Sequence, residues 1–144
     1  MRCDENDLNR FVAPNERDFD EALSEIRAGR KRSHWIWYIF PQIQGLGVSS
    51  TSMYYGIRDL DEARRFLDHP VLGRNLREIT EALLELDTDD ADEVMGWPDN
   101  MKLRSSMTLF ELADPDEDMF GRVLDKFYGG ERDDRTVSIL ERGY

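Results

Sequence analysis

Side chains capable of chemistry are concentrated in the segment Pro98–Thr108, where Lys102 precedes Ser105 and Ser106 by about one helical turn. If this segment is helical, the spacing brings an amine close to two hydroxyls. A desolvated lysine acting as base toward a serine nucleophile is one interpretation. Anion binding by Lys102 is a second, and bonding of the hydroxyls back to helix carbonyls, with a role in packing alone, is a third. The pattern is common in helices, and it favours packing over anion binding and anion binding over catalysis.

A basic cluster interrupts the otherwise acidic sequence, and it consists of Arg27, Arg30, Lys31 and Arg32. Arginine can donate two hydrogen bonds to one phosphate or carboxylate, so the cluster is a candidate anion site. The same residues follow the expected end of a helix, where cations offset the helix dipole and pair with nearby acids. We favour this second interpretation. Arg30, Lys31 and Lys102 stay as the candidates for anion binding.

The sequence lacks the motifs that usually hold metals or cofactors. His34 and His69 lie 35 residues apart, and neither has a second ligand at metal-binding spacing. The acidic run 87–93 does not begin a calcium loop, because position 6 of the loop is Asp92 in place of glycine and position 12 is Pro98 in place of glutamate. Segment 44–50 has only part of the glycine pattern of a dinucleotide-binding loop. We therefore expect no metal and no cofactor, and the single cysteine, Cys3, excludes an internal disulfide.

Apolar periodicity and capping residues predict an all-α fold, a compact multihelical single domain of about seven helices over residues 1–144. Asp18 is the expected start of the first helix, Asp59 of a helix of about nine residues, and Asp133 of the last one. The clearest apolar stripe runs over 72–86, whereas the helix expected over 98–113 has a mixed pattern.

The aromatic run 35–40 is the one ambiguous segment. Its aromatic and β-branched residues favour a buried strand. However, no second segment offers a strand to pair with it, and an unpaired strand cannot satisfy its backbone groups. We therefore predict a buried helix.

Charge is the strongest signal in the composition. The chain has 31 acidic and 19 basic residues, for a net charge of −12, and its bases are 16 arginines and only 3 lysines. A field of this sign opposes binding to nucleic acid and to anionic membranes. No apolar stretch is long enough to span a bilayer, and no signal peptide is recognised, so we expect a cytoplasmic protein.

Five separated motifs, in order, resemble a bacterial family designated domain of unknown function 1810, over about residues 8–140. They are Glu25–Gln42 with Gly45-Leu46-Gly47, Tyr55-Gly56-Ile57, His69–Gly73, Pro98–Phe110 and Tyr128-Gly129-Gly130. The resemblance implies an all-helical fold, and the family has no established function. Some members carry the label calpastatin, an extended and disordered inhibitor, which does not suit this aromatic-rich chain.

The polar residues within these motifs are more than a helical core needs, so we expect them to converge on one pocket for a small anionic, phosphate-bearing ligand. The candidates are His34, Trp37, Gln42, Tyr55, Asp99, Lys102, Ser105, Ser106 and Tyr128. In particular, Lys102, His34 and Tyr128 are expected to approach one another. The alternative is a polar network that fixes helix packing in a non-catalytic interaction or regulatory module. Catalysis and oligomeric state are left open.

An acidic chain with few lysines also fits adaptation to a salt-rich cytoplasm, or alternatively a GC-rich genome that favours arginine. In the first case, removing molar salt exposes the repulsion among the acids and destabilises the fold. Thermal unfolding in 0.1 M and 2 M KCl, where the Debye length falls from about 10 Å to under about 3 Å, tests this. Adaptation to salt predicts a higher melting temperature in 2 M KCl, and equal melting temperatures would reject it in favour of the genome composition.

Overall fold

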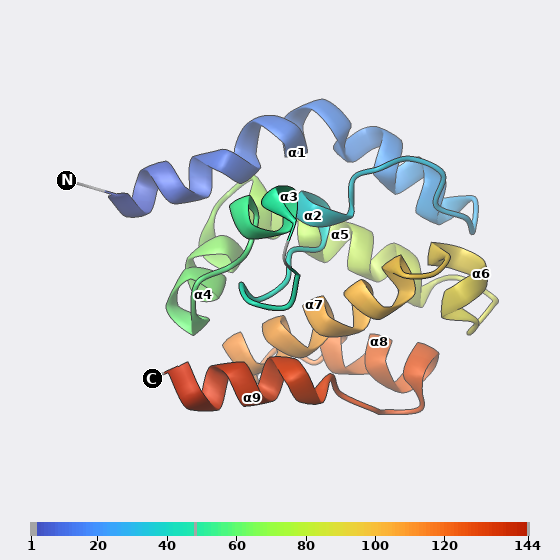
Figure 1. Ribbon diagram of the computed structural model, residues 1–144. Helices are drawn as coiled ribbons and strands as arrows, with labels where there is room; N and C mark the ends of the chain where they lie inside the picture. The colour runs from blue at the N-terminus through green and yellow to red at the C-terminus, as the bar shows by residue number, and fades with distance from the viewer. Residues whose placement is uncertain (1–2, 48, 144) are drawn as a thin grey trace.

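The computed structural model describes residues 3–47 and 49–143, and within these ranges the chain folds into helices without a strand (Figure 1). In the described ranges the nine helices are α1 (Cys3–Arg27), α2 (Ile36–Ile39), α3 (Ser50–Tyr54), α4 (Leu60–Asp68), α5 (Leu72–Leu84), α6 (Ala91–Met95), α7 (Asp99–Ala113), α8 (Met119–Tyr128) and α9 (Asp134–Gly143). The all-α prediction is confirmed, but the expected number, about seven, is too low. Helices α3 and α6 have only five residues each, too few for apolar periodicity to define them. None of the described helices is long and apolar enough to cross a membrane.

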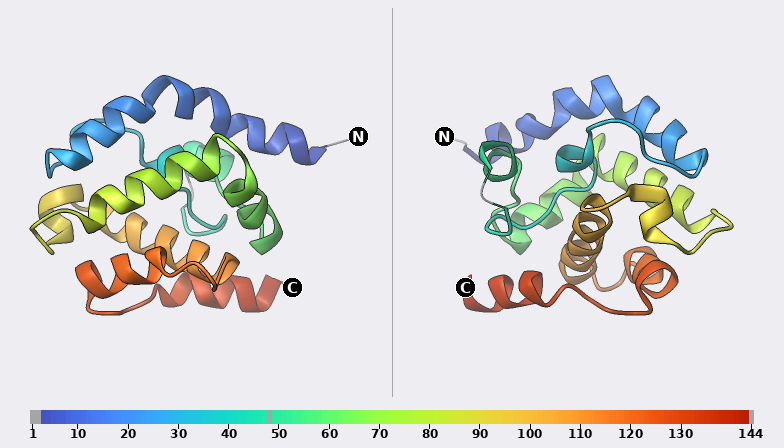
Figure 2. Two further views of the ribbon diagram at one scale, coloured as in Figure 1. Left: turned by 180° about the vertical axis from the view of Figure 1, so that it is seen from behind. Right: turned by 45° about the vertical axis from the view of Figure 1, so that its right-hand side comes forward.

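Helix α7 lies at the centre of the molecule. It contacts α4, α6, α8 and α9, and Figure 2 shows α1 and α5 above it and α8 and α9 below it. All residues from 105 to 110 are buried. A helix that is covered on most sides does not need a single apolar stripe, which explains the mixed pattern over 98–113.

The capping pattern predicts that the first helix begins at Asp18, but α1 begins at Cys3 and continues through this position. The capping pattern is overridden because buried apolar residues such as Phe11 extend the packing face toward the N-terminus. Pro14 lies inside the helix, which changes direction near its middle (Figure 1). The buried Asn15 amide donates to the carbonyl oxygens of Phe11 and Tyr38, at 3.0 and 2.9 Å, and so ties this bend to α2.

The aromatic run is helical, as predicted, although only four of its residues form α2. Helix α2 contacts α1 and α7, and the chain then makes an isolated parallel bridge between Ile43 and Ile57. In this bridge the Gln44 N–H donates to the Ile57 carbonyl at 2.7 Å, and the Ile57 N–H donates to the Gln42 carbonyl at 2.8 Å. These two bonds hold the 42–47 loop in place.

A buried carboxylate, Glu25, fixes the connection between α1 and α2. It accepts hydrogen bonds from Trp35 Nε1 at 2.9 Å, from the Arg32 N–H at 2.8 Å, and from the N–H and hydroxyl of Ser33 at 3.0 and 2.6 Å. Burial alone would raise the pKa of Glu25, but these donors outweigh it and lower the pKa to about 2. The charged carboxylate is therefore part of the fold at neutral pH.

Replacing Glu25 with glutamine keeps the side-chain size and one acceptor oxygen but removes the charge. Because folding lowers the pKa of Glu25 from 4.5 to about 2, its charge stabilises the fold fully above about pH 4.5, and this contribution disappears as the pH falls through 2. We expect Glu25→Gln to lower the free energy of unfolding by about 2–3 kcal/mol at pH 7 and by less than half of that at pH 3. Urea unfolding at both pH values measures the difference.

The matched control is Glu16→Gln, which removes an exposed carboxylate from the same helix. It should change the unfolding free energy little at either pH. An equal loss for Glu25→Gln at pH 7 and pH 3 would contradict a role for the charge.

Candidate ligand-binding cleft

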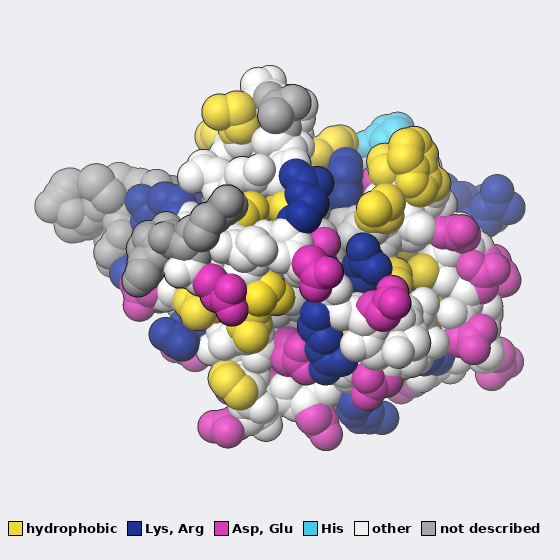
Figure 3. All heavy atoms as spheres, turned by 60° about the horizontal axis from the view of Figure 1, so that its bottom comes forward, with side chains coloured by type: hydrophobic (Ala, Val, Ile, Leu, Met, Phe, Trp, Pro, Cys, Tyr) yellow, Lys and Arg dark blue, Asp and Glu magenta, His cyan; other side chains and the backbone are white. Residues whose placement is uncertain are grey.

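A cleft of about 620 Å³ opens between the 42–47 loop, Ser52, the first turns of α7 and the start of α9. Figure 3 looks onto this face and shows Lys and Arg side chains gathered around its middle, with acidic side chains among them and around them. Four cations and three acids line the cleft, in a chain whose net charge is −12. The lining residues are Gln42, Leu46, Gly47, Ser52, Pro98, Met101, Lys102, Arg104, Ser105, Glu131, Arg132, Asp133, Asp134 and Arg135.

The buried side chain of Asp133 joins α7 to α9 at this cleft. Its carboxylate accepts hydrogen bonds from the Ser105 hydroxyl at 2.8 Å, the Thr136 hydroxyl at 2.6 Å and the Thr136 N–H at 3.3 Å. The Asp133 N–H donates to the Thr108 hydroxyl at 3.0 Å. Asp133 therefore caps α9, as predicted, and the two hydroxyls of α7 that face it are one turn apart.

The serine hydroxyls do not form a nucleophile–base pair with Lys102. The Ser105 hydroxyl contacts Asp133 and the Met101 carbonyl, the latter at 3.2 Å. The Ser106 hydroxyl is fully buried and has no hydrogen-bond partner among the described residues. Bonding back to a helix carbonyl, one of the three interpretations of this segment, is therefore present at Ser105.

Two lysines share one aspartate beside the cleft. The Lys31 amine lies 2.8 Å from Asp99 Oδ2, and its side chain is only 6% exposed. The Lys102 amine lies 3.7 Å from the other oxygen of Asp99 and 5.3 Å from the ring centroid of Trp37. It makes no hydrogen bond with any residue that the structure describes. Two positive charges thus meet one negative charge, which leaves a positive excess at the cleft.

The arginines of the lining differ in how firmly they are held. Arg132 donates to both carboxylate oxygens of Glu111, at 2.9 and 2.5 Å, and to the Gly130 carbonyl at 2.7 Å. Arg104 lies 3.6 Å from Glu131, an acid that is 77% exposed. Arg135 donates to the Leu46 carbonyl at 3.1 Å, and no carboxylate pairs with it in the described part of the chain. Arg132 is therefore structural, whereas Arg104 and Arg135 can still bind an anion.

The structure brings together six of the nine predicted pocket residues. Gln42, Lys102 and Ser105 line the cleft, and Asp99 lies next to Lys102. Trp37 and Tyr55 line a smaller hollow that shares Gln42, Leu46, Gly47 and Ser52 with it. Segments far apart in the sequence, around α2 and at the start of α7, therefore meet here.

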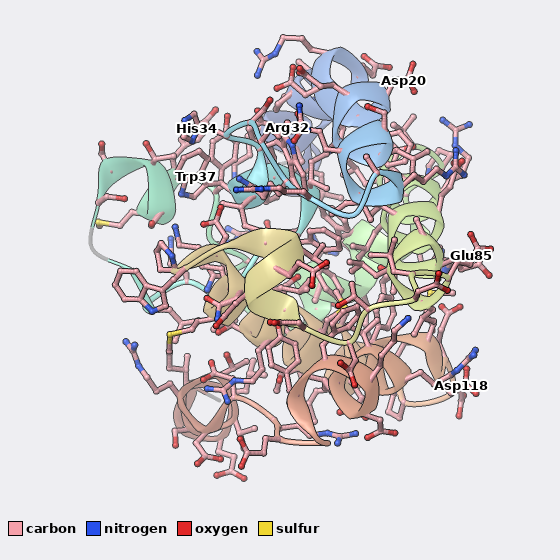
Figure 4. All side chains as sticks on the ribbon, turned by 90° about the vertical axis from the view of Figure 1, so that its right-hand side faces the viewer. Asp20, Arg32, His34, Trp37, Glu85 and Asp118 are labelled. Carbon is pink, nitrogen blue, oxygen red and sulfur yellow. The ribbon has the colours of Figure 1, made fainter. Side chains whose placement is uncertain are left out.

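His34, Tyr128 and Ser106 do not line this cleft, and neither does Arg30, which is exposed. His34 is also exposed, and Figure 4 shows it on the side of Trp37 away from α7. The Tyr128 hydroxyl donates to the Asn100 carbonyl at 2.5 Å, in a different hollow whose lining includes Asp89, Asp90 and Asp92. Burial raises the pKa of Tyr128 above its ordinary value, so the phenol stays protonated. Lys102 therefore lines the cleft, Tyr128 lines another hollow and His34 lines neither, so the expected convergence of the three on this cleft is not seen.

The sequence did not single out Arg104, Asp134 or Arg135 as site residues. The chain has 16 arginines, so no arginine stands out by its type. The sequence did indicate that Asp133 begins the last helix, and this cap lies where the first turn of α9 meets α7. Within the described ranges, no group of three His, Cys, Asp or Glu side chains could hold a metal ion.

All three lysines occupy partly buried positions. Like Lys31, Lys126 serves several acceptors, and it donates to three carbonyl oxygens in and just after the last turn of α5. An ammonium is compact and can direct three donors to different acceptors, whereas a guanidinium is planar. This explains lysine at two positions in an arginine-rich chain. At Lys102 the same compact charge borders the cleft.

Comparisons with known proteins identify one family and one solved structure. The family model described as "Protein of unknown function (DUF1810)" matches residues 5–140. The crystal structure of a conserved hypothetical protein from Mycobacterium tuberculosis, Rv1873, is similar with a TM-score of 0.91 and 44% sequence identity, over 94% of this chain and 96% of that one. No curated protein matches the sequence.

Replacing Asp133 with alanine removes the cap of α9 and leaves the Ser105 and Thr136 hydroxyls without their shared acceptor. We expect a loss of about 2–3 kcal/mol in the free energy of unfolding, measured with urea at pH 7. Asp134→Ala is the matched control, because this neighbouring side chain is exposed, and it should cost less than about 0.5 kcal/mol. Similar losses for the two variants would show that the buried network does not stabilise the α7–α9 junction.

Proposed function

The chain belongs to the DUF1810 family of proteins of unknown function, and we propose that its cleft binds a small phosphate-bearing molecule. The Lys102 amine is the observation that carries the proposal. It borders the cleft, its nearest carboxylate lies 3.7 Å away and is shared with Lys31, and no described residue accepts a hydrogen bond from it. Such an amine gains a charge-assisted hydrogen bond when an anion arrives.

Arg104 and Arg135 support the same ligand class. Arg104 is paired only with the exposed Glu131, at 3.6 Å, and exposed pairs of this length contribute little. Arg135 is held by a single hydrogen bond to a backbone carbonyl. Both guanidiniums line the cleft with Lys102, so three cations from two helices can contribute donors to one phosphate.

The acids of the lining narrow the class of ligand further. Glu131 and Asp134 are exposed at the cleft and offer acceptors only. They would repel a bare anion, but they can accept hydrogen bonds from the hydroxyls of a sugar. A sugar phosphate therefore matches the lining better than a dicarboxylate, because it offers an anion to the cations and donors to the acids. A long polyanion such as nucleic acid is opposed by the net charge of −12.

Titration with ribose 5-phosphate by isothermal calorimetry at low ionic strength tests the proposal. We expect Lys102→Met to weaken binding at least tenfold, about 1.4 kcal/mol, because the methionine keeps the apolar stem but loses the charge. The melting temperature should stay nearly unchanged, since no described hydrogen bond is lost.

Arg30→Met is the control, because it also removes one positive charge but lies outside the cleft. It should leave the dissociation constant within about twofold of the original. Equal weakening by both variants would mean that the sugar phosphate responds only to the overall charge. Failure of the unaltered protein to bind ribose 5-phosphate or inorganic phosphate at millimolar concentration would overturn the proposal.

A further inference from the structure

Trp97 is the most exposed large hydrophobic side chain in the described part of the molecule, at 77%. An exposed indole does not contribute the stabilisation that burial of its large apolar surface would give. The other two tryptophans are used differently, since Trp35 is buried in the core and Trp37 lies beneath the Lys102 amine. No described side chain stacks on Trp97.

The position of Trp97 relates it to the cleft. It directly precedes Pro98, which lines the cleft, and Met101, another lining residue, is 48% exposed. Figure 3 shows exposed hydrophobic side chains at the edge of the Lys and Arg cluster. An apolar rim therefore borders a basic interior on this side.

Trp97 lies close to the cations along the chain, five residues before Lys102. Helix α7 begins at Asp99, and Lys102 follows three residues later, about 4.5 Å along the axis. The backbone N–H of Lys102 donates a hydrogen bond to the Pro98 carbonyl at 3.3 Å, so the first turn of α7 follows Trp97 directly. A planar group on Trp97 and an anion on Lys102 can thus belong to one small molecule.

We infer that the ligand is a nucleotide whose base stacks on Trp97 while its phosphate binds Lys102, Arg104 and Arg135. This inference rests on the proposed function and adds the aromatic base to it. A ribose between base and phosphate presents hydroxyls to Glu131 and Asp134, and the flexible Met101 side chain can pack against the sugar or base. Stacking on an exposed indole needs no rearrangement of the core, and it is tolerant of base identity because every base has a flat face.

Paired titrations with AMP and ribose 5-phosphate separate the base from the phosphate. We expect AMP to bind more tightly than ribose 5-phosphate, and Trp97→Ala to weaken AMP binding about tenfold while changing ribose 5-phosphate binding less than about twofold. Leu112→Ala, which truncates another exposed hydrophobic residue on α7 outside the cleft, is the control and should change neither.

Fluorescence provides a second readout that does not depend on affinity. AMP should quench part of the tryptophan emission, and this part should be missing in Trp97→Phe, whereas ribose 5-phosphate should quench little. If both ligands bind in a Lys102-dependent way but Trp97→Ala leaves AMP binding unchanged, the base does not stack there and only this inference is wrong. If neither ligand binds, the proposed function and this inference fail together.

Discussion

The enclosure of α7 is the constraint on which the rest of the structure depends. A helix covered by α4, α8 and α9 leaves few of its side chains in water, so each polar group that it carries needs a partner. The hydroxyls of Ser105 and Thr108 find theirs in the first turn of α9. The Ser106 hydroxyl, Asn100 Oδ1 and Arg104 Nε are exceptions, because these buried atoms have no hydrogen-bond partner among the described residues. Near the start of α7 the covering is incomplete, and there Lys102 and Arg104 border the cleft.

One wall of the cleft is formed by connecting segments that backbone and side-chain hydrogen bonds hold in place. Glu25 fixes the chain before α2, and the bridge between Ile43 and Ile57 holds the loop after it. Arg10 ties the next segment to α1, because it pairs with the buried Glu62 at 3.1 Å and donates to the Gly56 carbonyl at 2.7 Å. These interactions add to the packing of Ile43 and Ile57 in the core, and the buried Glu25 and Glu62 carboxylates favour this arrangement because a buried charge is costly without its partners.

Charge is distributed unevenly between the surface and this site. The molecule as a whole repels anions, yet Lys31 and Lys102 face a single carboxylate, and Arg104 and Arg135 lack short ion pairs among the described residues. A local excess of positive charge on a molecule of negative net charge favours small anions over large ones. A small anion can enter the basic cleft, whereas a large one also meets the acidic surface around it.

The sequence by itself determined the local structure of this protein. Asp59 and Asp90 cap α4 and α6, and Asp133 caps α9, because a cap involves only residues within about one turn of each other. The helical state of the aromatic run also followed from the lack of a strand partner. Where a local pattern competed with packing, as at Asp18, packing decided, because the buried face of α1 extends further than its capping signals.

Only the tertiary structure decided which polar residues share a site. Trp37 lies beneath the Lys102 amine, while His34, three residues earlier, is exposed. Arg135 reaches the cleft because the Asp133 network seats α9 on α7. These outcomes depend on the angles and distances at which several helices pack, and such geometry comes from contacts between residues far apart in the chain. Spacing along the sequence therefore located the helices and their caps, but it could not separate the lysine that borders the cleft from the tyrosine that faces another hollow.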